Sequence, residues 1–224
     1  SYSLPTREAI TRLMRKAPIL PLVLLLTLHF VALCAGFFAP YPSDRQHRNL
    51  VFAPPARLLF FDPEGKFHLR PFVYALRAET DGSYQEDQSR KFPVRFFVTG
   101  EPYRIAELWS ARIRLFGVDE PATIFLLGSD DYGRDQFSRF LFGAQISLLA
   151  GPVAVCLALL FGAGVGGLSG FYGGFADDLL MAVTEIVLSL PWLYLLLGVR
   201  AVLPLDLEPR QAFLVIVSVL GLIG

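Results

Sequence analysis

Four long apolar runs, separated by more polar stretches, dominate the pattern of the chain. They cover Ile19 to Ala39, Ile146 to Gly170, Leu179 to Leu203, and Gln211 to Gly224, where the sequence stops. A helix of about 20 apolar residues crosses the ~30 Å hydrocarbon core of a bilayer. The pattern therefore predicts three membrane-spanning helices and the beginning of a fourth.

These runs divide the chain into five segments. We expect an N-terminal segment at 1–17, a first transmembrane helix at 18–39, a β-rich insert at 40–127, an amphipathic segment at 128–145, and transmembrane helices two to four at 146–224, the fourth incomplete. A helix cannot end in hydrocarbon with unpaired carbonyl groups, so we expect further chain beyond Gly224. The predicted fold class is an α-helical membrane bundle with a small β-rich insert between its first two spans.

Basic residues precede the first apolar run. Arg7, Arg12, Arg15 and Lys16 stand there against one acidic residue, Glu8. Cytoplasmic flanks of membrane helices carry an excess of Lys and Arg. We therefore expect a cytoplasmic N-terminus, an uncleaved first span, and a multi-pass protein of the bacterial inner membrane. Counting the crossings places 41–145 in the periplasm, the turn 171–178 inside, and 204–210 outside.

The insert carries turn and strand signals. Asp62-Pro63-Glu64-Gly65 has the residues of a type I turn and joins Arg57–Phe61 to Lys66–Ala75 in a predicted hairpin. Lys91–Thr99 is predicted as a further strand, with Val94, Phe96 and Val98 on one face, and Asp81-Gly82 as another turn. Docking of a partner protein, contact with substrate, and a cap that stabilises the bundle all remain open as the role of this insert.

Two features of the later runs bear on how their helices pack. Gly162, Gly166 and Gly170 recur at spacings of four on one helix face, which lets another helix approach closely. The alternative is that glycine is simply common in membrane helices. In the third run, Glu185 is expected at the membrane interface or facing the bundle interior, and Pro191 is expected to kink the helix.

Composition narrows the function classes. Hydrophobic residues make up 54% of the chain and charged residues only 18%, against about a quarter charged in soluble domains. The formal net charge is zero, which indicates no nucleic-acid partner. Cys34, Cys156 and the three histidines lack ligand-like spacing, so we expect no metal or cofactor. The absence of a GxxxxGK[ST] motif argues against an ATPase site in this chain.

The segment just before the second run has a definite pattern of its own. Ser129 or Asp130 is expected to cap a helix start. Phe137, Phe140 and Leu141 then fall on one face, which predicts an amphipathic helix lying in the membrane interface. Arg134, Asp135 and Arg139 are close enough in sequence for local ion pairs.

Two stretches of the chain also carry a family likeness. One runs from Leu127 to Leu148; the other is Gly170-Phe171-Tyr172-Gly173-Gly174, followed by Asp177, Met181, Glu185 and Leu190-Pro191. In this order they resemble the signature motifs of the C-type permease subunits of dipeptide, oligopeptide and nickel ABC importers, over residues 127–200. Three positions depart from the motifs: Ser129 stands for Thr, and Gln145 and Ala182 each stand for Arg.

The resemblance implies an ABC importer permease fold and a set of site residues. These are a periplasmic signature at Gly128, Asp130, Gly133, Arg134, Asp135 and Arg139, packing positions at Gly162, Gly166 and Gly170, and a cytoplasmic-side turn with an intramembrane charge at Gly173, Gly174, Asp177 and Glu185. The implied partners are a second homologous permease, two cytoplasmic ATPase subunits, a periplasmic solute-binding protein and membrane lipid. The family's ATPase-coupling segment is expected beyond Gly224.

Two other functions compete with transport. A membrane-anchored sensor would use the insert to bind a ligand or partner, and it predicts a cytoplasmic output domain after the fourth span. A membrane-anchored enzyme would place its catalytic residues in the insert. His68 of the insert has no Ser or Cys at a recognisable spacing, and Gly167-Leu168-Ser169-Gly170 lacks the last glycine of a nucleophile elbow.

Overall fold

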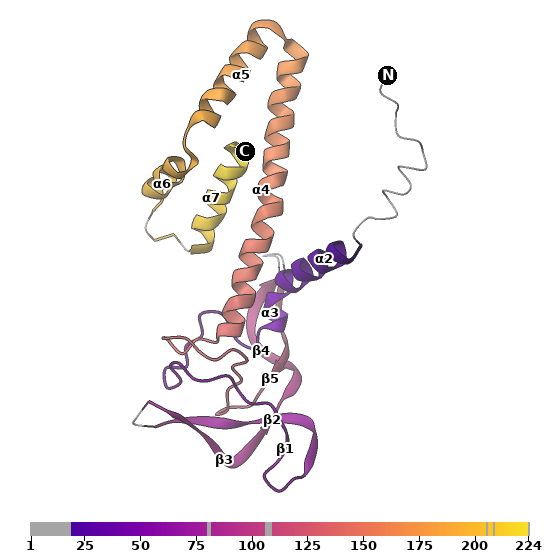
Figure 1. Cartoon of the computed structure of the whole chain (residues 1–224), viewed down its shortest axis with the longest axis vertical. Helices are drawn as coiled ribbons and strands as arrows, with labels where there is room; N and C mark the ends of the chain where they lie inside the picture. The colour runs from indigo at the N-terminus through magenta and orange to yellow at the C-terminus, as the bar shows by residue number, and fades with distance from the viewer. Residues whose placement is uncertain (1–18, 80–81, 106–108, 205, 208, 224) are drawn as a thin grey trace. The chain divides into compact units, whose positions relative to one another are not determined.

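The computed structural model describes residues 19–79, 82–105, 109–204, 206–207 and 209–223. Two compact units divide the chain: unit 1 covers residues 1–145 and unit 2 covers residues 146–224. The elements of unit 1 are α2 (Ile19–Leu33), α3 (Ala35–Phe38), β1 (Leu59–Phe61), β2 (Phe67–Ala78), β3 (Tyr84–Pro93), β4 (Arg95–Ile105) and β5 (Trp109–Gly117) (Figure 1). The helix α4 (Gln136–Tyr172) begins in unit 1 and continues into unit 2.

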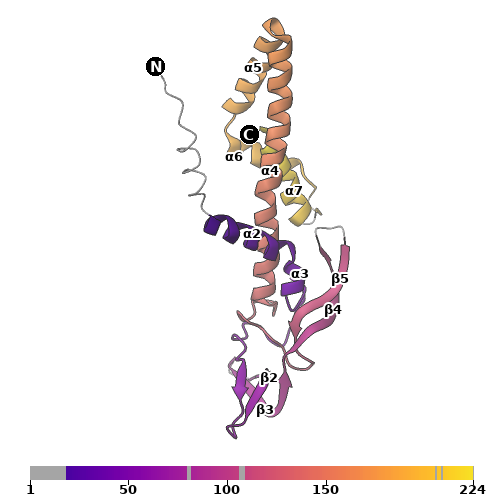
Figure 2. The ribbon, with the colours of Figure 1, turned by 90° about the vertical axis from the view of Figure 1, so that its right-hand side faces the viewer.

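The five strands form two antiparallel sheets (Figure 2). One sheet has the order β1-β2-β3, and the other is the hairpin β4-β5. The predicted hairpin around Asp62 is confirmed: β1 pairs with β2, and the Gly65 N–H donates to the Asp62 carbonyl at 2.9 Å. The turn at Gly82 is also present, with the Gly82 N–H donating to the Glu79 carbonyl at 3.1 Å; Asp81 lies outside the described residues.

The prediction of one strand over Lys91–Thr99 is wrong. The chain leaves the first sheet after Pro93 and enters the second at Arg95. Val94 lies between them, 3% exposed, and its N–H donates to the Pro71 carbonyl at 2.8 Å. Because the backbone changes sheet here, Val94 points into the core while Phe96 is 55% exposed.

The first predicted span is not one continuous helix among the described residues. α2 ends at Leu33, and the four-residue helix α3 follows Cys34. Ala35 and Ala39 are fully buried against Leu141 of α4. At 15 residues, α2 is shorter than the length needed to cross a bilayer.

A buried arginine joins the second hairpin to α3. Arg114 of β5 is 1% exposed, and its Nη1 donates to the Ala39 carbonyl at 2.8 Å, where α3 ends. Its guanidinium also lies over the ring of Tyr103, at 5.4 Å. A cation at a helix C-terminus satisfies carbonyl groups that lack intrahelical partners. Pro40 follows, and Ala39 has the extended backbone typical of a residue before proline, so α3 ends here with its last carbonyl bonded to Arg114.

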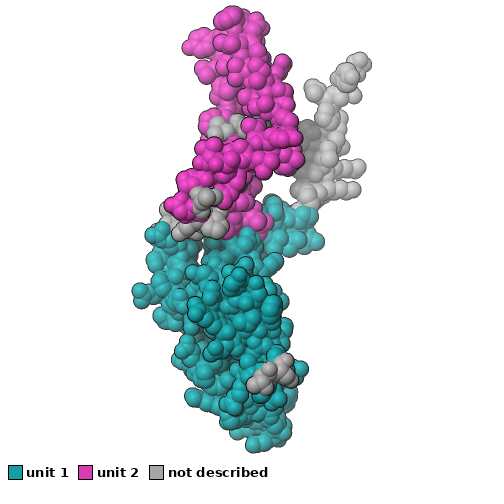
Figure 3. Space-filling view, turned by 90° about the vertical axis from the view of Figure 1, so that its left-hand side faces the viewer, with its two compact units in different colours: residues 1–145 teal, residues 146–224 magenta. Residues whose placement is uncertain are grey.

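Unit 2, which Figure 3 draws in magenta, is helical in its described residues. It contains most of α4, then α5 (Gly174–Ser189), α6 (Trp192–Val202) and α7 (Pro209–Ile223). The predicted turn 171–178 is mostly helix, because α4 runs to Tyr172 and α5 begins at Gly174. α7 packs on α4 through Gly221, where an added Cβ would lie 2.8 Å from the Ala154 carbonyl oxygen.

The third predicted run is a broken helix. α5 and α6 meet at a bend of 84°. Leu190 takes an extended conformation there (φ −71°, ψ 130°), as expected for a residue that precedes proline. The kink predicted at Pro191 is therefore confirmed.

Candidate membrane spans are fewer among the described residues than the four apolar runs suggested. α4 is the one described helix long and apolar enough to cross a bilayer, and the bent pair α5–α6 qualifies as a second if it acts as one span.

Candidate functional segment before the helix α4

Two glycines shape the loop that precedes α4. Gly128 and Gly133 have φ of +79° and +71°, in the left-handed region that favours glycine. A Cβ added at Gly133 would lie 2.2 Å from the His47 carbonyl oxygen, and one at Gly128 would lie 2.7 Å from the Ala53 carbonyl oxygen. Both positions therefore need glycine for conformation and for space.

Asp130 is the centre of the loop. Its Oδ1 accepts the N–H groups of Tyr132 and Arg134, each at 2.9 Å. Its Oδ2 accepts the Arg134 Nε at 2.7 Å and pairs with the Arg139 Nη1 at 3.1 Å. Burial acts to raise the pKa of the Asp130 carboxyl, but the hydrogen bonds from Arg134 and Tyr132 outweigh it and lower this pKa. Asp130 is thus held as a carboxylate.

The same loop holds an earlier part of the chain. The Ser129 Oγ accepts the Ala53 N–H at 2.8 Å and donates to the Leu50 carbonyl, and the Ser129 N–H donates to the Ala53 carbonyl at 3.0 Å. The His47 N–H donates to the Gly133 carbonyl at 2.9 Å. We call residues 128–135 the signature loop; together with residues 47–53 it forms a hydrogen-bonded unit.

The helix cap lies at Asp135, so the prediction of Ser129 or Asp130 as the cap is wrong. α4 begins at Gln136, and the Asp135 Oδ2 accepts the Ser138 N–H at 2.8 Å and the Ser138 Oγ–H at 2.6 Å. Ser129 and Asp130 lie too early because the loop between them and α4 is closed by their own contacts. Asp135 is 1% exposed, and burial raises the pKa of its carboxyl.

The predicted amphipathic helix is only partly present. Residues 128–135 are not helical, and α4 continues from Gln136 into the membrane run without a break. Leu141 is 5% exposed and packs with Phe137 on the α3 residues Ala35 and Ala39, whereas Phe140 is 66% exposed. The three apolar residues therefore do not share one environment, because α3 covers only part of the face.

The predicted ion pairs form, but with a different acid. Arg134 and Arg139 both pair with Asp130, at 2.7 and 3.1 Å, whereas the Asp135 carboxylate caps the helix. Arg134 also lies over the ring of Tyr132, at 4.5 Å. The structure thus brings Gly128, Asp130, Gly133, Arg134, Asp135 and Arg139 together in one loop and helix start.

The cytoplasmic-side residues of the prediction meet at the turn between α4 and α5. Gly173 and Gly174 have φ of +59° and +54°, so each adopts a backbone that other residues avoid. The Ser169 Oγ donates to the Asp177 Oδ1 across this turn. Glu185 lies two turns further along α5, is exposed, and is not part of this cluster.

Gly162, Gly166 and Gly170 are exposed on α4, and an added Cβ at each would meet no atom within 4 Å. Gly162 and Gly166 line a groove between α4 and α5, of about 300 Å³, with Val165 and Met181 also in its wall. The role of the three glycines in packing stays a prediction, because no described helix of this chain covers them.

Sequence reasoning missed three contacts that organise this region. Arg114 caps α3, as described above. The Gln145 Nε2 donates to the Leu33 carbonyl at 3.3 Å, where α2 ends, from the position where the family motif has arginine. The Tyr41 hydroxyl accepts the Ile124 N–H at 3.0 Å, and burial raises the pKa of this hydroxyl to about 12. Nothing in local sequence indicates these contacts, because each joins residues more than 70 positions apart.

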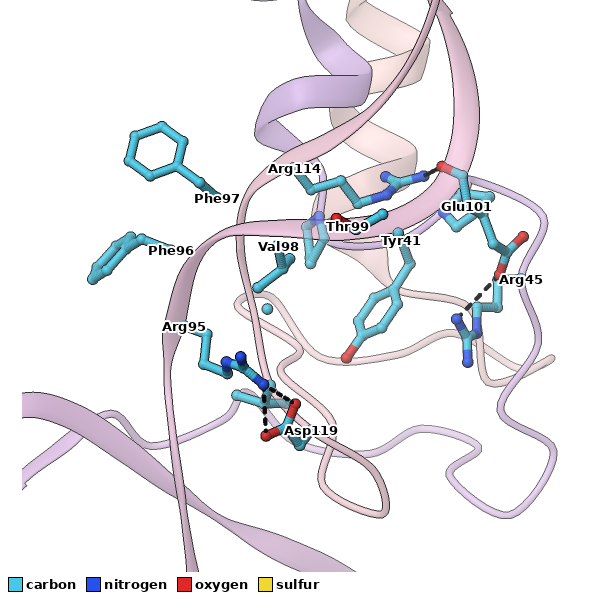
Figure 4. Close-up of a pocket in the computed structure, with 15 residues that line it drawn as sticks. Tyr41, Arg45, Arg95, Phe96, Phe97, Val98, Thr99, Glu101, Arg114 and Asp119 are labelled. Carbon is cyan, nitrogen blue, oxygen red and sulfur yellow. Dashed lines mark hydrogen bonds and ion pairs between the residues drawn. The ribbon is translucent and has the colours of Figure 1, made fainter.

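A cavity of about 450 Å³ lies beside Arg114 (Figure 4). Its charged side chains are mostly paired: Arg45 with Glu101 at 3.1 Å, and Arg95 with Asp119 at 3.0 Å. No cluster of three or more His, Cys, Asp or Glu able to hold a metal occurs within the described part of the chain.

Comparison with known proteins finds permease proteins of transport systems among the relatives. The chain is 38% identical over 95 residues to the dipeptide transport system permease protein DppC of Haemophilus influenzae, which covers 42% of this chain and 32% of the relative. It is 45% identical over 83 residues to the probable D,D-dipeptide transport system permease protein DdpC of Escherichia coli (37% and 28%). It is 39% identical over 84 residues to the oligopeptide transport system permease protein OppC of Bacillus subtilis (38% and 28%).

These matches cover part of each protein. The chain spans about a third or less of the length of these relatives. No family model and no solved structure matches it. Over the matched stretch, the chain is therefore similar to the permease proteins of dipeptide and oligopeptide transport systems.

Proposed function

We propose that this chain forms part of the transmembrane permease subunit of an ATP-driven importer of peptides or similar small solutes. The observation that carries the proposal is the identity of 38% and 45% to permease proteins of dipeptide and D,D-dipeptide transport systems. The relatives' names support peptides as the solute class. The chain itself carries no ATP-binding motif, so ATP hydrolysis belongs to separate subunits.

The structure supports a part in the translocation pathway for unit 2. α4 is 37 residues long, and between Ile146 and Tyr172 it carries no charged residue. The α5–α6 pair bends by 84° within an apolar run, and a broken helix is tolerated in a membrane where protein or a water-filled cavity surrounds it. We propose that unit 2 is multi-pass and that it contributes to the wall of the pathway with a second, homologous permease.

The signature loop supports a positioning role at the periplasmic entrance. Asp130 and Asp135 are buried and bonded within the chain, so they are not displayed to a passing solute. They tie residues 47–53 to the first turn of α4. We propose that this unit fixes where α4 enters the membrane and so shapes the entrance to which a periplasmic solute-binding protein delivers its cargo.

The remaining assignments follow from the same proposal. The N-terminus lies in the cytoplasm, the strands of unit 1 lie in the periplasm, and two cytoplasmic ATPase subunits drive the transport cycle. ATP binding there shifts the permease pair between two states by contacting them differently.

Uptake by intact cells tests the proposed function. A strain that lacks the complete subunit should fail to accumulate radiolabelled di- and tripeptides. The complete subunit should restore uptake only when the partner ATPases retain their activity. Unchanged peptide uptake in the deletion strain, together with no co-purification of ATPase subunits, would overturn the proposal.

A further inference from the structure

A cavity of about 620 Å³ lies within unit 1, beside the segment that the signature loop holds. The His47 N–H donates to the Gly133 carbonyl, and the Leu50 carbonyl accepts the Ser129 hydroxyl, so one side of the cavity is fixed to that loop. The end of β2 and two residues that follow β5 form the other sides. We call it the arginine cavity, and its lining consists of His47, Arg48, Asn49, Leu50, Leu76, Arg77, Ala78, Pro121 and Thr123.

The charge in the wall of the arginine cavity has one sign. Arg48 and Arg77 belong to the wall, and no Asp or Glu is found among the described residues that line it. The chain as a whole is balanced, with 20 Lys and Arg against 20 Asp and Glu. The cavity beside Arg114 is also different, because Glu101 and Asp119 lie in its wall. Since no acid in its wall offsets the two cations, the arginine cavity attracts anions.

The hydrogen-bond donors of this wall are largely free. Arg48 and Asn49 are exposed, and neither side chain has an ion pair or a hydrogen bond within the described part of the chain. The Arg77 side chain is 74% exposed and pairs through Nη2 with Asp87 of β3 at 3.3 Å, which leaves its other N–H groups for a ligand. A guanidinium binds a carboxylate through two parallel N–H donors. The cavity thus offers two guanidinium groups and an amide to an anion.

The rest of the wall is mostly apolar. Leu50, Leu76, Ala78 and Pro121 line the cavity together with the two arginines. The C-terminal residue of a peptide has the same two parts, a carboxylate and a side chain next to it. An inorganic anion would use the cations alone. The volume of the cavity falls within the range of about 300–1,000 Å³ that is usual for small-ligand sites.

We propose that the arginine cavity binds the C-terminal carboxylate of a short peptide, with Arg48 and Arg77 as the cations and Asn49 as a further donor. The inference rests on the proposed function, because the names of the relatives give dipeptides and oligopeptides as their solutes. It gives the insert one of the roles that the sequence left open, contact with substrate. Because residues 47 and 50 are bonded to the signature loop, a peptide bound here lies beside the loop that we assign to the entrance.

Isothermal titration calorimetry of the complete subunit tests the cavity. The probes are alanyl-alanine, alanyl-alanine amide, which lacks the carboxylate, and inorganic phosphate. Alanyl-alanine should bind about tenfold more tightly than either of the others, and Arg48→Gln should weaken its binding by about tenfold. Arg77→Gln should weaken it less, because Arg77 already shares its charge with Asp87. The matched control Arg70→Gln removes an exposed cation of β2 that does not line the cavity, and it should leave binding unchanged.

A second variant changes binding in the opposite direction. Asp87→Asn removes the carboxylate that competes with a ligand for Arg77, so this variant should bind alanyl-alanine more tightly than the wild type does. A gain of this kind cannot result from a damaged fold.

Three outcomes overturn the cavity inference. They are no binding of alanyl-alanine at millimolar concentration, equal binding of the amide or of phosphate, and binding to Arg48→Gln that is as tight as binding to Arg70→Gln. Peptide uptake by cells with the wild-type subunit separates this inference from the proposed function. If uptake is normal and one of the three outcomes is found, the cavity inference fails alone; if the wild-type subunit supports no uptake, the proposed function is what fails.

Discussion

Gly133 couples backbone conformation and close approach at a single residue. Its φ of +71° excludes most side chains, and the His47 carbonyl leaves no room for a Cβ. Gly65 has a similar φ, +77°, but faces open space. The pair allows the cost of backbone strain to be measured apart from the cost of a clash.

We predict that Gly65→Ala lowers the stability of the subunit by about 1–2 kcal/mol, the cost of left-handed backbone. Gly133→Ala should lose about 1–3 kcal/mol more, because the added methyl group overpacks the contact with residue 47. Thermal unfolding of the detergent-purified subunit measures both. Equal losses for the two variants would show that the contact between the signature loop and His47 does not form.

Asp130 predicts a dependence on pH. The pKa of the Asp130 carboxyl is lowered in the folded state. The carboxylate therefore stabilises the fold fully above the ordinary carboxyl pKa of about 4, and this stabilisation is lost as the pH falls through the lowered pKa. Asp130→Asn should cost about 3 kcal/mol at pH 7, because it leaves Arg134 and Arg139 without their acid. The difference in free energy of unfolding between the wild type and the variant, measured by chemical denaturation, should narrow below about pH 4.

Asp131→Asn is the matched control for that measurement. Asp131 is exposed, and its carboxylate lies 3.9 Å from the Arg134 guanidinium, which makes a weak ion pair. The substitution should therefore change the free energy of unfolding by no more than about 0.5 kcal/mol. Asp135, whose pKa is raised, has the opposite pH dependence, but it is present in each protein and cancels from the comparison. A wild-type advantage that is the same at pH 7 and pH 3 would refute the role of Asp130.

The sequence located these residues but not their roles. Ser and Asp are both favoured at helix N-caps, so Ser129 and Asp130 were equally good candidates for the cap of α4. The local sequence does not reveal that Ser129 instead bonds to Leu50 and Ala53. Those contacts join positions more than 70 residues apart. The cap of α4 is Asp135 instead, because Ser129 is held by its hydrogen bonds to residues 50 and 53.

At the scale of elements, the sequence predicted where the helix breaks between α5 and α6, but it did not predict the angle of the bend. Pro191 indicated a kink, but proline can also lie inside a continuous helix, as Pro152 does in α4. The 84° bend depends on Leu190 adopting an extended backbone. In the same way, sequence alternation detected a strand near Lys91–Thr99 but not that Val94 turns the chain into a second sheet.

We predict that Pro191→Ala opens this bend, because Leu190 is then free to become helical. Spin labels at Asp178 and Arg200 should be about 25 Å apart in the bent pair and about 33 Å apart in a straight helix, at 1.5 Å rise per residue. Pulsed electron paramagnetic resonance measures the distance. The matched variant Pro152→Ala, labelled at the same two sites, should leave it unchanged, and a Pro191→Ala distance equal to wild type would contradict the prediction.

At the scale of the whole molecule, the sequence predicted a membrane protein that resembles a permease family, and the relatives it matches are permease proteins of dipeptide and D,D-dipeptide transport systems. The number of spans was harder to predict. The apolar run at Ile19–Ala39 is long enough to cross a bilayer, yet α2 ends at Leu33. The hydrophobicity of a segment does not indicate where its helix ends or which distant residues, such as Arg114 at Ala39, contact that end. The topology therefore stays a prediction.

We predict that the β1–β2 turn and the turn between α4 and α5 lie on opposite sides of the membrane. In a background with native cysteines replaced, Glu64→Cys should react with a membrane-impermeant maleimide added to spheroplasts, because β1–β2 is periplasmic. Asp178→Cys, near the turn between α4 and α5, should react only after the membrane is permeabilised. Both positions are exposed in the structure. Reaction of Asp178→Cys in intact spheroplasts would refute the proposed orientation.

ATP-driven peptide accumulation in proteoliposomes tests the central claim most directly. The complete subunit is reconstituted with its partner permease and ATPases, with ATP on the ATPase side and the solute-binding protein loaded with a labelled dipeptide on the other. We predict transport into the ATP-containing compartment that requires this subunit and stops when the ATPases are inactivated. A complex that assembles and hydrolyses ATP, yet moves no peptide or moves it equally without this subunit, would contradict the account.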